Sequence, residues 1–319
     1  GRLAHQRRAA AANLDAAREG LRSERLQIET RAAHAFHALQ LAVARQRLAQ
    51  ERLAFAEGLR TGTGPLVRYL SPLERARLDI LRETARQDVA HAEGKWSEAQ
   101  AQFRALLDLP PDVQPETTLL VPADAPAALS VLHDRLAVHP ALRATQQELE
   151  SSRAGVDVAR AQRLADPTVS IFREQDYLAG SRQDYTGVML SVQIPLWNQN
   201  DGGVARARAE ADRVDAQLDA QRRAIESRLR QSHLHLGHLI EQAEHYRTRL
   251  LEPAQQMLRL TRKAFAAGEQ NGLALLDASN TYFDTQARYL ELLQEAWIEA
   301  ADLRLATGIA LTQRAENQP

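Results

Sequence analysis

The chain has 319 residues, of which 44% are hydrophobic and only 5% aromatic, and its formal net charge is −1. This composition is typical of long helices with narrow apolar seams, and the balanced charge favours neither nucleic acid nor an anionic membrane surface as a partner. Cysteine is absent, which excludes disulfides, zinc–thiolate sites and cysteine nucleophiles, and no apolar run reaches the about 18 residues of a transmembrane helix.

Residues 1–109 predict a long helical hairpin. The segment 3–57 carries apolar side chains along one face, and the glycine-rich stretch 58–65 is expected to end this helix. A second helix is predicted to begin directly after Ser71, because Ser71 and Glu74 have the spacing of a capping box. The turn between the two helices forms the first tip.

Residues 110–126 contain five prolines and no helical period, which predicts a linker between two halves of the chain. The following segment, 127–165, predicts a third helix, interrupted or kinked near Pro140. Asp166 and Pro167 are expected to stop this helix, because a proline disfavours helical backbone in the residue before it.

The segment 166–197 carries the strongest strand pattern of the chain. From Gly187 to Ile194, apolar residues alternate with small or polar ones, which predicts a strand with one apolar face. Residues 168–175 alternate less clearly, and the polar stretch 176–184 is expected to be the loop of a β-hairpin. Two alternatives remain: a strand of a soluble sandwich, or a membrane β-barrel strand with its apolar face toward lipid.

Residues 198–310 predict a second helical hairpin. Between residues 204 and 264 apolar side chains recur every three or four residues, as in the seam of a coiled coil, so the helix needs partner helices of similar length. The last part of this seam is predicted at Tyr246, Leu250, Pro253, Met257, Leu260 and Ala264. Pro253 also predicts a kink, because it removes a backbone hydrogen bond. We expect the helix to end at Gly268 and a returning helix to span residues 274–307.

The two helical hairpins look like two copies of one unit. Phe55-Ala56-Glu57-Gly58 and Phe265-Ala266-Ala267-Gly268 lie 210 residues apart, each near the end of a long predicted helix. Such a repeat predicts one supersecondary unit used twice. Because residue 1 already lies in the first long helix, we expect the β-hairpin of the first copy to precede it. Residues 311–319 are expected to be a tail.

Three passages resemble the TolC family of outer-membrane efflux proteins. They are residues 194–203 (Ile-Pro-Leu-Trp-Asn-Gln-Asn-Asp-Gly-Gly), the two Phe-x-x-Gly tips, and Leu275-Leu276-Asp277-Ala278. The first is most like the strand-to-helix transition of the heavy-metal (CzcC-like) branch. The resemblance implies a mainly α fold, with long antiparallel coiled-coil hairpins of a periplasmic α-barrel and one β-hairpin of an outer-membrane β-barrel.

The resemblance also implies a function and partners. It implies a passive exit duct for metal cations or small toxic compounds, formed by a homotrimer in outer-membrane lipid. The trimer would work with a periplasmic adaptor protein and an inner-membrane pump of the RND class, without a cofactor or nucleic acid. The alternative is a structural coiled-coil scaffold of the periplasm without a transport role. No nucleotide-binding loop, zinc-protease pair or nucleophile elbow points to an enzyme.

Site residues follow from the same resemblance. The implied periplasmic entrance residues are Asp277, Glu269 and Gln270. The implied adaptor-docking tips are Glu57, Gly58 and Leu59 in the first copy, and Ala267, Gly268 and Gly272 in the second. Carboxylates around a constriction attract cations. For Asp277 the alternative is a helix N-cap, and Ala274 departs from a second acidic position of some family members.

Histidines are the remaining candidates for chemistry. His233, His238 and His245 have spacings that can bring imidazoles together on a helix, which makes them weak metal-ligand candidates. No cysteine or closely spaced carboxylate completes a ligand set, so solvated histidines are the alternative.

Overall fold

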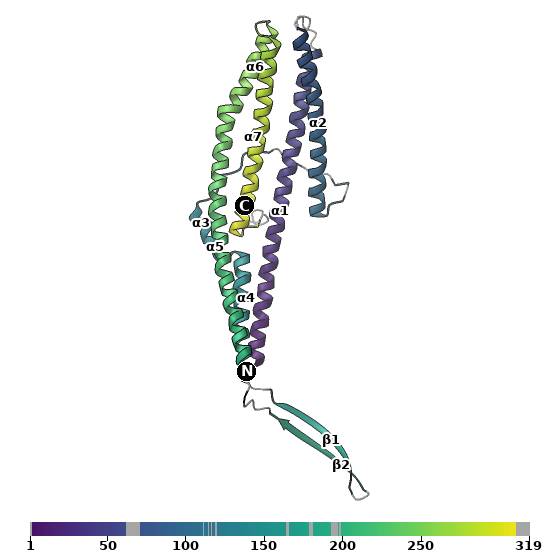
Figure 1. The fold of residues 1–319 in the computed structure, drawn as a ribbon, viewed down its shortest axis with the longest axis vertical. Coiled ribbons are helices and arrows are strands. Elements are labelled where there is room, and N and C mark those ends of the chain that lie inside the picture. The colour runs from purple at the N-terminus through teal and green to yellow at the C-terminus, as the bar shows by residue number, and fades with distance from the viewer. Residues whose placement is uncertain are drawn as a thin grey trace, which may run out of the picture. The chain divides into compact units, whose positions relative to one another are not determined.

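The computed structural model describes residues 2–61, 71–110, 112–113, 115, 117–118, 120–163, 166–178, 181–192, 197 and 199–310. The helices are α1 (Arg2–Thr61), α2 (Pro72–Leu107), α3 (Leu129–Asp134), α4 (Pro140–Ala161), α5 (Asp201–Tyr246), α6 (Glu252–Ala266) and α7 (Gly272–Thr307) (Figure 1). The strands are β1 (Thr168–Leu178) and β2 (Ser181–Ser191). A 3-10 turn, Arg135–Val138, precedes α4, and a π-helical turn, Arg247–Leu251, joins α5 to α6. The predicted mainly α fold with one β-hairpin is confirmed.

The chain divides into two compact units. Unit 1 comprises residues 1–23 and 137–224, and unit 2 comprises residues 24–136 and 225–319. Helices α1 and α5 contribute residues to both units.

In unit 1, α4 packs against the beginnings of α1 and α5. The Ser151 hydroxyl donates to the Ala9 carbonyl at 3.1 Å, and the Thr145 hydroxyl donates to the side-chain oxygen of Gln221 at 2.6 Å. Gln221 therefore satisfies its polar group inside the predicted seam, as a packing residue would. Small and branched side chains allow close approach of the helices; the buried ones are Ala12, Ala16, Leu142, Leu149, Ala154, Val156, Ala159, Val204, Ala211, Val214 and Leu218.

The start of α5 is fixed by an asparagine and a glycine. Asn200 has a left-handed backbone (φ 58°), and its amide donates to the carbonyl of Ala159 at the end of α4, at 2.9 Å. A Cβ atom on Gly203 would lie 2.3 Å from the Asn200 side-chain oxygen, whereas one on Gly202 would meet nothing within 4 Å. Gly203 thus leaves the space that Asn200 needs in order to join α5 to α4.

The β-hairpin is longer than predicted. β1 and β2 pair from Thr168↔Ser191 to Leu178↔Ser181, so most of the polar stretch predicted as a loop belongs to the strands. One face is apolar and open; its exposed side chains are Val169 (66%), Ile171 (78%), Val188 (71%) and Leu190 (66%). A strand with one apolar face can carry polar residues on its other face. The polar composition of residues 176–184 therefore did not distinguish a strand from a loop, and the loop was predicted too long.

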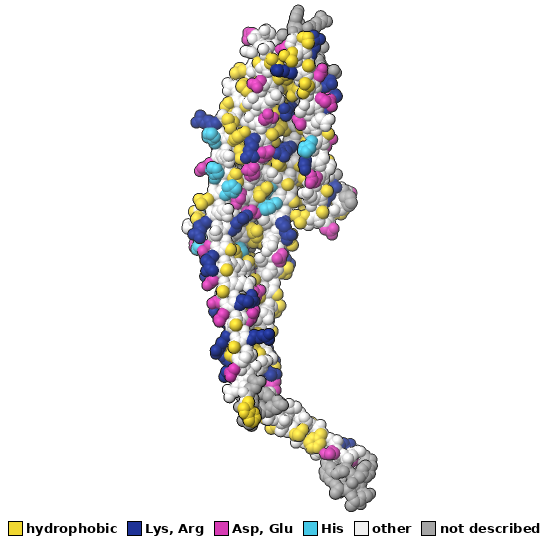
Figure 2. All heavy atoms as spheres, viewed as in Figure 1, with side chains coloured by type: hydrophobic (Ala, Val, Ile, Leu, Met, Phe, Trp, Pro, Cys, Tyr) yellow, Lys and Arg dark blue, Asp and Glu magenta, His cyan; other side chains and the backbone are white. Residues whose placement is uncertain are grey.

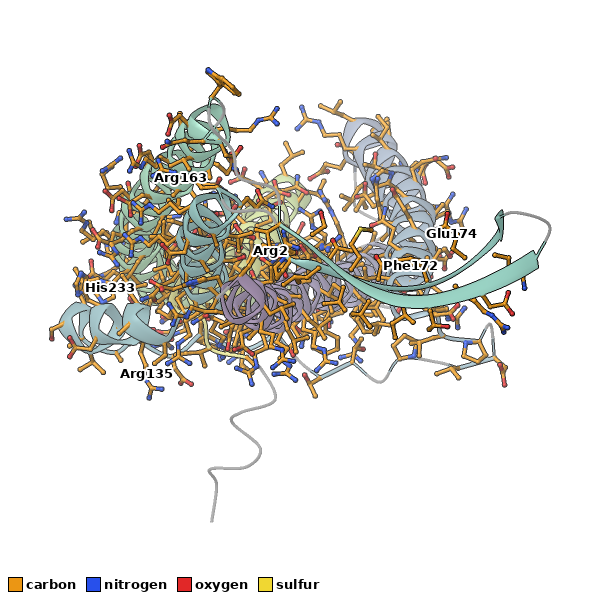
Figure 3. The ribbon with its side chains drawn as sticks, turned by 90° about the horizontal axis from the view of Figure 1, so that it is seen from below. Arg2, Arg135, Arg163, Phe172, Glu174 and His233 are labelled. Atoms are coloured by element: carbon orange, nitrogen blue, oxygen red, sulfur yellow. The ribbon has the colours of Figure 1, made fainter. Side chains whose placement is uncertain are left out.

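The opposite face of the hairpin carries Phe172 and Glu174 of β1 (Figure 3). Phe172 pairs with Gly187 of β2, and a Cβ atom on that glycine would lie 2.6 Å from the Phe172 ring. The aromatic ring therefore covers the glycine backbone, an arrangement that protects an otherwise weak strand position.

In unit 2, α7 and the second part of α1 lie in the middle, with α6 on one flank and α2 on the other (Figure 1). One core cluster joins the linker, α3, α5 and α7; its buried members are Ala123, Leu132, Leu136, Leu229, Leu236, Leu239, Ala296, Leu303 and Ala306. A smaller cluster of Ala56, Leu81 and Leu276 joins α1, α2 and α7 near the tips.

The linker is attached to unit 2 by polar contacts. The indole N–H of Trp297 donates to the Val121 carbonyl at 2.7 Å, and the Gln40 amide donates to the Thr118 hydroxyl at 2.9 Å. His37 stacks on Trp297, with ring centroids 5.1 Å apart, and lies 2.8 Å from the Gln40 side-chain oxygen. Burial lowers the pKa of the His37 imidazole, although its hydrogen bond with Gln40 acts in the opposite direction.

The predicted seam of α5 is confirmed up to Ala243 and wrong beyond Tyr246. The N–H of Glu252 bonds the carbonyl of Arg247, five residues back, so the π turn holds one residue more than a helical turn would. One extra residue rotates the following helix by about 100°. Leu250, Met257 and Leu260 are consequently exposed, by 45%, 38% and 58%, instead of lying in the core.

Pro253 accounts for the position of this break. Proline inside a continuous helix costs ~3 kcal/mol, because its N–H is missing and its ring meets the carbonyl four residues back. Here it is the second residue of α6, directly after the π turn, where a missing N–H costs least. The predicted kink thus takes the form of a register shift.

Candidate functional site

The second tip is built by two capping motifs. At the end of α6, Gly268 is left-handed (φ 75°) and its N–H bonds the Phe265 carbonyl at 3.0 Å, while the N–H of Glu269 bonds the Ala264 carbonyl at 2.8 Å. These two bonds define a Schellman motif. Asn271 then caps α7, because its side-chain oxygen accepts from the Ala274 N–H at 2.9 Å.

The predicted residues of the second tip lie in different surroundings. Ala267, Gly268, Glu269 and Gln270 are exposed, whereas Gly272 is buried as the first residue of α7. A partner that reaches the tip therefore meets the first four residues and not Gly272.

The first tip differs from the second. α1 continues through Gly58 to Thr61, past the predicted helical segment 3–57 and into the stretch 58–65 that was expected to end it. Leu59 packs on the cluster of Ala56, Leu81 and Leu276, and Glu57 lies 3.5 Å from the Arg86 guanidinium of α2. Residues 62–70, which include the rest of the predicted turn, lie outside the described residues.

A single carboxylate joins the two tips. The predicted capping box is confirmed: Ser71 accepts from the Glu74 N–H at 3.2 Å, and Glu74 accepts from the Ser71 N–H at 2.8 Å. The other oxygen of Glu74 accepts from the buried N–H of Gly272 at 3.1 Å. Backbone and side-chain hydrogen bonds with Ser71, and then the bond from Gly272, hold the pKa of Glu74 below its ordinary value.

Asp277 lies exposed on α7, at the rim of a cavity of about 400 Å³ between α2 and α7. Its alternative role as N-cap is wrong, because Asn271 has that role and α7 begins at Gly272. The cavity lining is Arg52, Arg77, Ile80, Leu81, Thr84, Leu273, Leu276, Asp277 and Asn280. Two arginines, Arg52 and Arg77, line the same cavity, and their positive charge weakens the attraction of the cavity for cations.

Sequence reasoning missed Arg52, which connects three helices beneath the tips. From α1, its guanidinium donates to the Asn280 side-chain oxygen of α7 at 2.9 Å and lies 3.5 Å from Asp88 of α2 and 3.7 Å from Asp284 of α7. It also lines a second cavity of about 310 Å³. The sequence did contain a signal: Arg52 is a charged residue three positions after Ala49 and four before Ala56, which is the spacing of apolar residues on one helix face.

The histidine candidates are not brought together. His233 Nε2 lies 3.0 Å from the Ala127 carbonyl, next to α3 (Figure 3), and His235 Nδ1 lies 2.9 Å from the Glu299 carboxylate of α7. His238 and His245 are exposed, and Figure 2 shows the histidines mixed with arginines and acids. Across the described part of the chain, no three His, Asp or Glu side chains are grouped closely enough to hold a metal ion.

None of the helices in the described residues is both long and apolar enough to cross a membrane.

The fold agrees with comparisons with known proteins. Residues 131–309, more than half of the chain, match the family model of the outer membrane efflux proteins. The chain belongs to this family of outer-membrane ducts, whose members are not enzymes.

One curated relative is the cobalt-zinc-cadmium resistance protein CzcC of Cupriavidus metallidurans, 25% identical over 241 residues. These residues make up 75% of this chain and 57% of CzcC, so the chain spans somewhat more than half of that relative.

Solved structures with the same fold include the open state of the Neisseria gonorrhoeae MtrE outer membrane channel, with a TM-score of 0.77 at 19% identity, covering 98% of this chain and 72% of MtrE. The channel protein CusC has a TM-score of 0.75 at 21% identity, covering 97% of this chain and 74% of CusC. VceC of Vibrio cholerae has a TM-score of 0.77 at 19% identity, covering 97% and 76%.

Proposed function

We propose that this chain is part of a passive exit duct of the outer membrane, working in a tripartite efflux pump. The observation that carries the proposal is the match of residues 131–309 to the outer membrane efflux proteins. The apolar, open face of the β-hairpin supports it, because such a face is stable when it meets lipid. The exposed indole of Trp197 (92%) suits the membrane–water interface.

Assembly into a homotrimer is part of the proposal. Unit 2 leaves apolar side chains exposed on α6 at one flank and on α2 at the other. A heterologous contact between unlike faces closes into a ring when the rotation between copies fits. Such a ring would place a cavity for cargo between copies of the chain.

The paired tips are the proposed contact with a periplasmic adaptor, which an RND pump of the inner membrane would energise. Glu57 and the exposed residues Ala267, Gly268 and Glu269 offer polar and backbone groups at one end of unit 2. Gln270 and Asp277 remain candidates for the entrance, with Glu269. Because Arg52 and Arg77 line the same cavity as Asp277, we propose that Asp277 tunes selectivity weakly.

Metal cations are the proposed cargo, with small toxic compounds as the second possibility. CzcC is named for resistance to cobalt, zinc and cadmium, and this chain is 25% identical to it. The proposed transport is passive, so the cargo needs no tight binding site in the duct.

The test is expression of the whole protein, with its adaptor and pump, in a Gram-negative host that lacks such a duct. We expect tolerance of Co²⁺, Zn²⁺ or Cd²⁺ to rise and the purified protein to conduct ions in planar bilayers. Asp277→Asn should lower cation selectivity, whereas Asp212→Asn, which removes an exposed charge of α5 in unit 1, should not. A water-soluble monomer without conductance would instead support the scaffold alternative.

A further inference from the structure

The cavity of about 310 Å³ lies where α1, α2 and α7 run side by side in unit 2 (Figure 1). Because α1 and α2 belong to the first helical hairpin and α7 to the second, both hairpins line it. Its volume is at the lower end of the range of about 300–1,000 Å³ for small-molecule sites, so it suits a small ligand. Most of its apolar residues are alanines, whose short side chains leave the space open; the apolar lining is Leu48, Ala49, Ala92, Phe283 and Ala287.

The charged residues of the lining are divided between two ends. At one end the Arg52 guanidinium lies 3.5 Å from Asp88 and 3.7 Å from Asp284, so carboxylates already match its charge. Arg45 lies seven residues before Arg52 on α1, and Lys95 lies seven residues after Asp88 on α2. Seven residues span about 10 Å of helix. Because α1 and α2 are antiparallel, Arg45 and Lys95 lie together at the other end.

Arg45, His91 and Lys95 form this basic end of the cavity. The charged side chains that line it are cations, and His91 adds an imidazole that can donate a hydrogen bond. Lys95 lies 2.9 Å from Glu98, but both side chains are more than half exposed, and such a surface pair contributes little stability. The ammonium group of Lys95 is therefore available to a further anion.

Arg45 also has room for a further anion. Its guanidinium forms an ion pair with Glu291, and Glu291 in turn accepts from Arg288 at 2.7 Å. One carboxylate is thus shared by two guanidinium groups, whereas a single guanidinium has five N–H donors. Arg45 can therefore bind the carboxylate of a ligand and keep its contact with Glu291.

Phe283 provides an aromatic surface away from the basic end. It precedes Asp284 on α7, so it lies near the Arg52 end of the cavity. Its side chain is only 5% exposed and packs edge-on against Phe55, which fixes the position of the ring. Aromatic rings associate favourably in stacked or edge-on arrangements. The cavity therefore offers apolar surface at one end and cations about 10 Å away.

We propose that this cavity binds a small amphiphilic anion, an aromatic carboxylate whose rings lie on Phe283 and whose carboxylate lies between Arg45 and Lys95. A cation would be repelled at the basic end, and a wholly polar ligand would leave the apolar lining uncovered. The bound anion contacts all three helices and so holds the two hairpins together. This site goes beyond the proposed duct and does not depend on it, because binding requires neither adaptor nor pump.

The first experiment compares Lys95 with Lys263, the two lysines of the chain. Both are exposed, but Lys263 lies on α6 outside the lining and is an internal control. The whole protein in lipid nanodiscs is acetylated with and without naphthylacetate, and the modified peptides are quantified by mass spectrometry. At a ligand concentration of about ten times the Kd, about one site in ten is free, so Lys95 should react about tenfold more slowly. Lys263 should react at an unchanged rate.

Two outcomes of this experiment would overturn the site. An unchanged rate at Lys95 would show that the probe does not lie between Arg45 and Lys95. Equal slowing of Lys95 and Lys263 would show that the probe coats the surface without preference.

The second experiment tests the charge of the ligand. Naphthylacetate, the neutral naphthylacetamide and the cationic naphthylethylamine share one apolar body, and naphthalene fluorescence measures their binding. We expect the carboxylate to bind about tenfold more tightly than the amide, because its hydrogen bonds to cations are charge-assisted, and the amine to bind most weakly. Lys95→Gln should lower this preference severalfold, and Lys263→Gln should not. Equal binding of carboxylate and amide, or tightest binding of the amine, would overturn the anion site.

The third experiment fills the cavity without changing a charge. Ala287→Leu places a larger side chain in the lining, so we expect it to weaken binding of all three compounds and to remove the protection of Lys95. Ala274→Leu, at a half-buried position of α7 outside the lining, is the matched control and should bind as wild type does. Circular dichroism checks that both variants remain helical. Full binding by Ala287→Leu would place the ligand elsewhere and overturn the site.

Discussion

The two tips of unit 2 carry the same Phe-x-x-Gly sequence and end differently. In the second tip Gly268 adopts a left-handed conformation and ends α6, whereas in the first tip Gly58 is an ordinary helical residue and α1 continues to Thr61. In the first tip, the aromatic residue Phe55 packs edge-on against Phe283 of α7, with ring centroids 6.0 Å apart.

The difference shows that a glycine permits a helix end but does not impose one. Leu59 follows Gly58 and gains apolar contacts with Ala56, Leu81 and Leu276 by remaining helical. After Gly268 come Glu269, Gln270 and the capping residue Asn271, which begin a new helix instead. The residues after the glycine therefore decide between the two outcomes.

The largest expected effect belongs to Gly268→Ala. A left-handed backbone costs a residue with a Cβ atom about 1–2 kcal/mol, so we expect the free energy of unfolding to fall by that amount. Chemical denaturation followed by circular dichroism measures the change. Gly20→Ala, inside α1 with open space around the glycine, is the control and should not destabilise the chain.

Loss of the helix caps should come next. Asn271→Ala and Ser71→Ala each remove a side-chain acceptor for the first turn of a helix, at a typical cost of about 1 kcal/mol. Ser71→Ala also frees Glu74 from its capping box, so we expect faster hydrogen exchange at Gly272 in the other tip. If exchange at Gly272 is the same in Ser71→Ala and wild type, the coupling between the tips is absent.

Gly58→Ala should have the opposite sign from Gly268→Ala. Glycine inside a helix is less stable than alanine by roughly 0.5–1 kcal/mol, and a Cβ atom at Gly58 would meet nothing within 4 Å. We expect a gain of about that size in the same denaturation measurement. Destabilisation by Gly58→Ala would mean that the first tip resembles the second after all.

The smallest expected effect is a pH dependence of the link between the tips. The pKa of Glu74 is lowered in the folded chain. The contribution of its carboxylate to the stability of the fold is therefore complete above the ordinary pKa of 4.5, and it is lost as the pH falls through the lowered pKa. A carbon-13 titration of the Glu74 carboxyl, read together with the Gly272 amide shift, should give one common midpoint below 4.5. In Glu74→Gln the Gly272 shift should not titrate in this range.

Much of the fold was predictable because local patterns and packing agree. Ser71 and Glu74 form the capping box that their spacing indicated, and the α5 seam is buried or half-buried from Val204 to Ala243. The strand pattern around Val188 gave the correct apolar face.

The wrong predictions arose where two interpretations fitted the same local sequence pattern equally well. Leu250, Met257 and Leu260 continue the seam as well as Leu251, Ala254 and Leu258 do, and only the packing on α7 together with Pro253 separates them. Asp277 looked like a cap because it follows two leucines, but Asn271 comes first and α7 is already under way.

The candidate site was less predictable than the fold. Glu74 was visible as a capping residue, but its bond to Gly272 joins segments that are far apart in the chain. Arg52 contacts Asp88, Asn280 and Asp284 only because three helices meet around it. Such contacts depend on tertiary packing, which spacing along one helix does not encode.

The junction between Asn200 and Gly203 has a consequence for how these sequences diverge. The Asn200 amide occupies the space beside residue 203 while it reaches the end of α4, so neither position can change freely alone. Related chains should therefore co-vary here: those that keep the asparagine keep the glycine, and those with a bulkier residue at the second position carry a smaller one at the first.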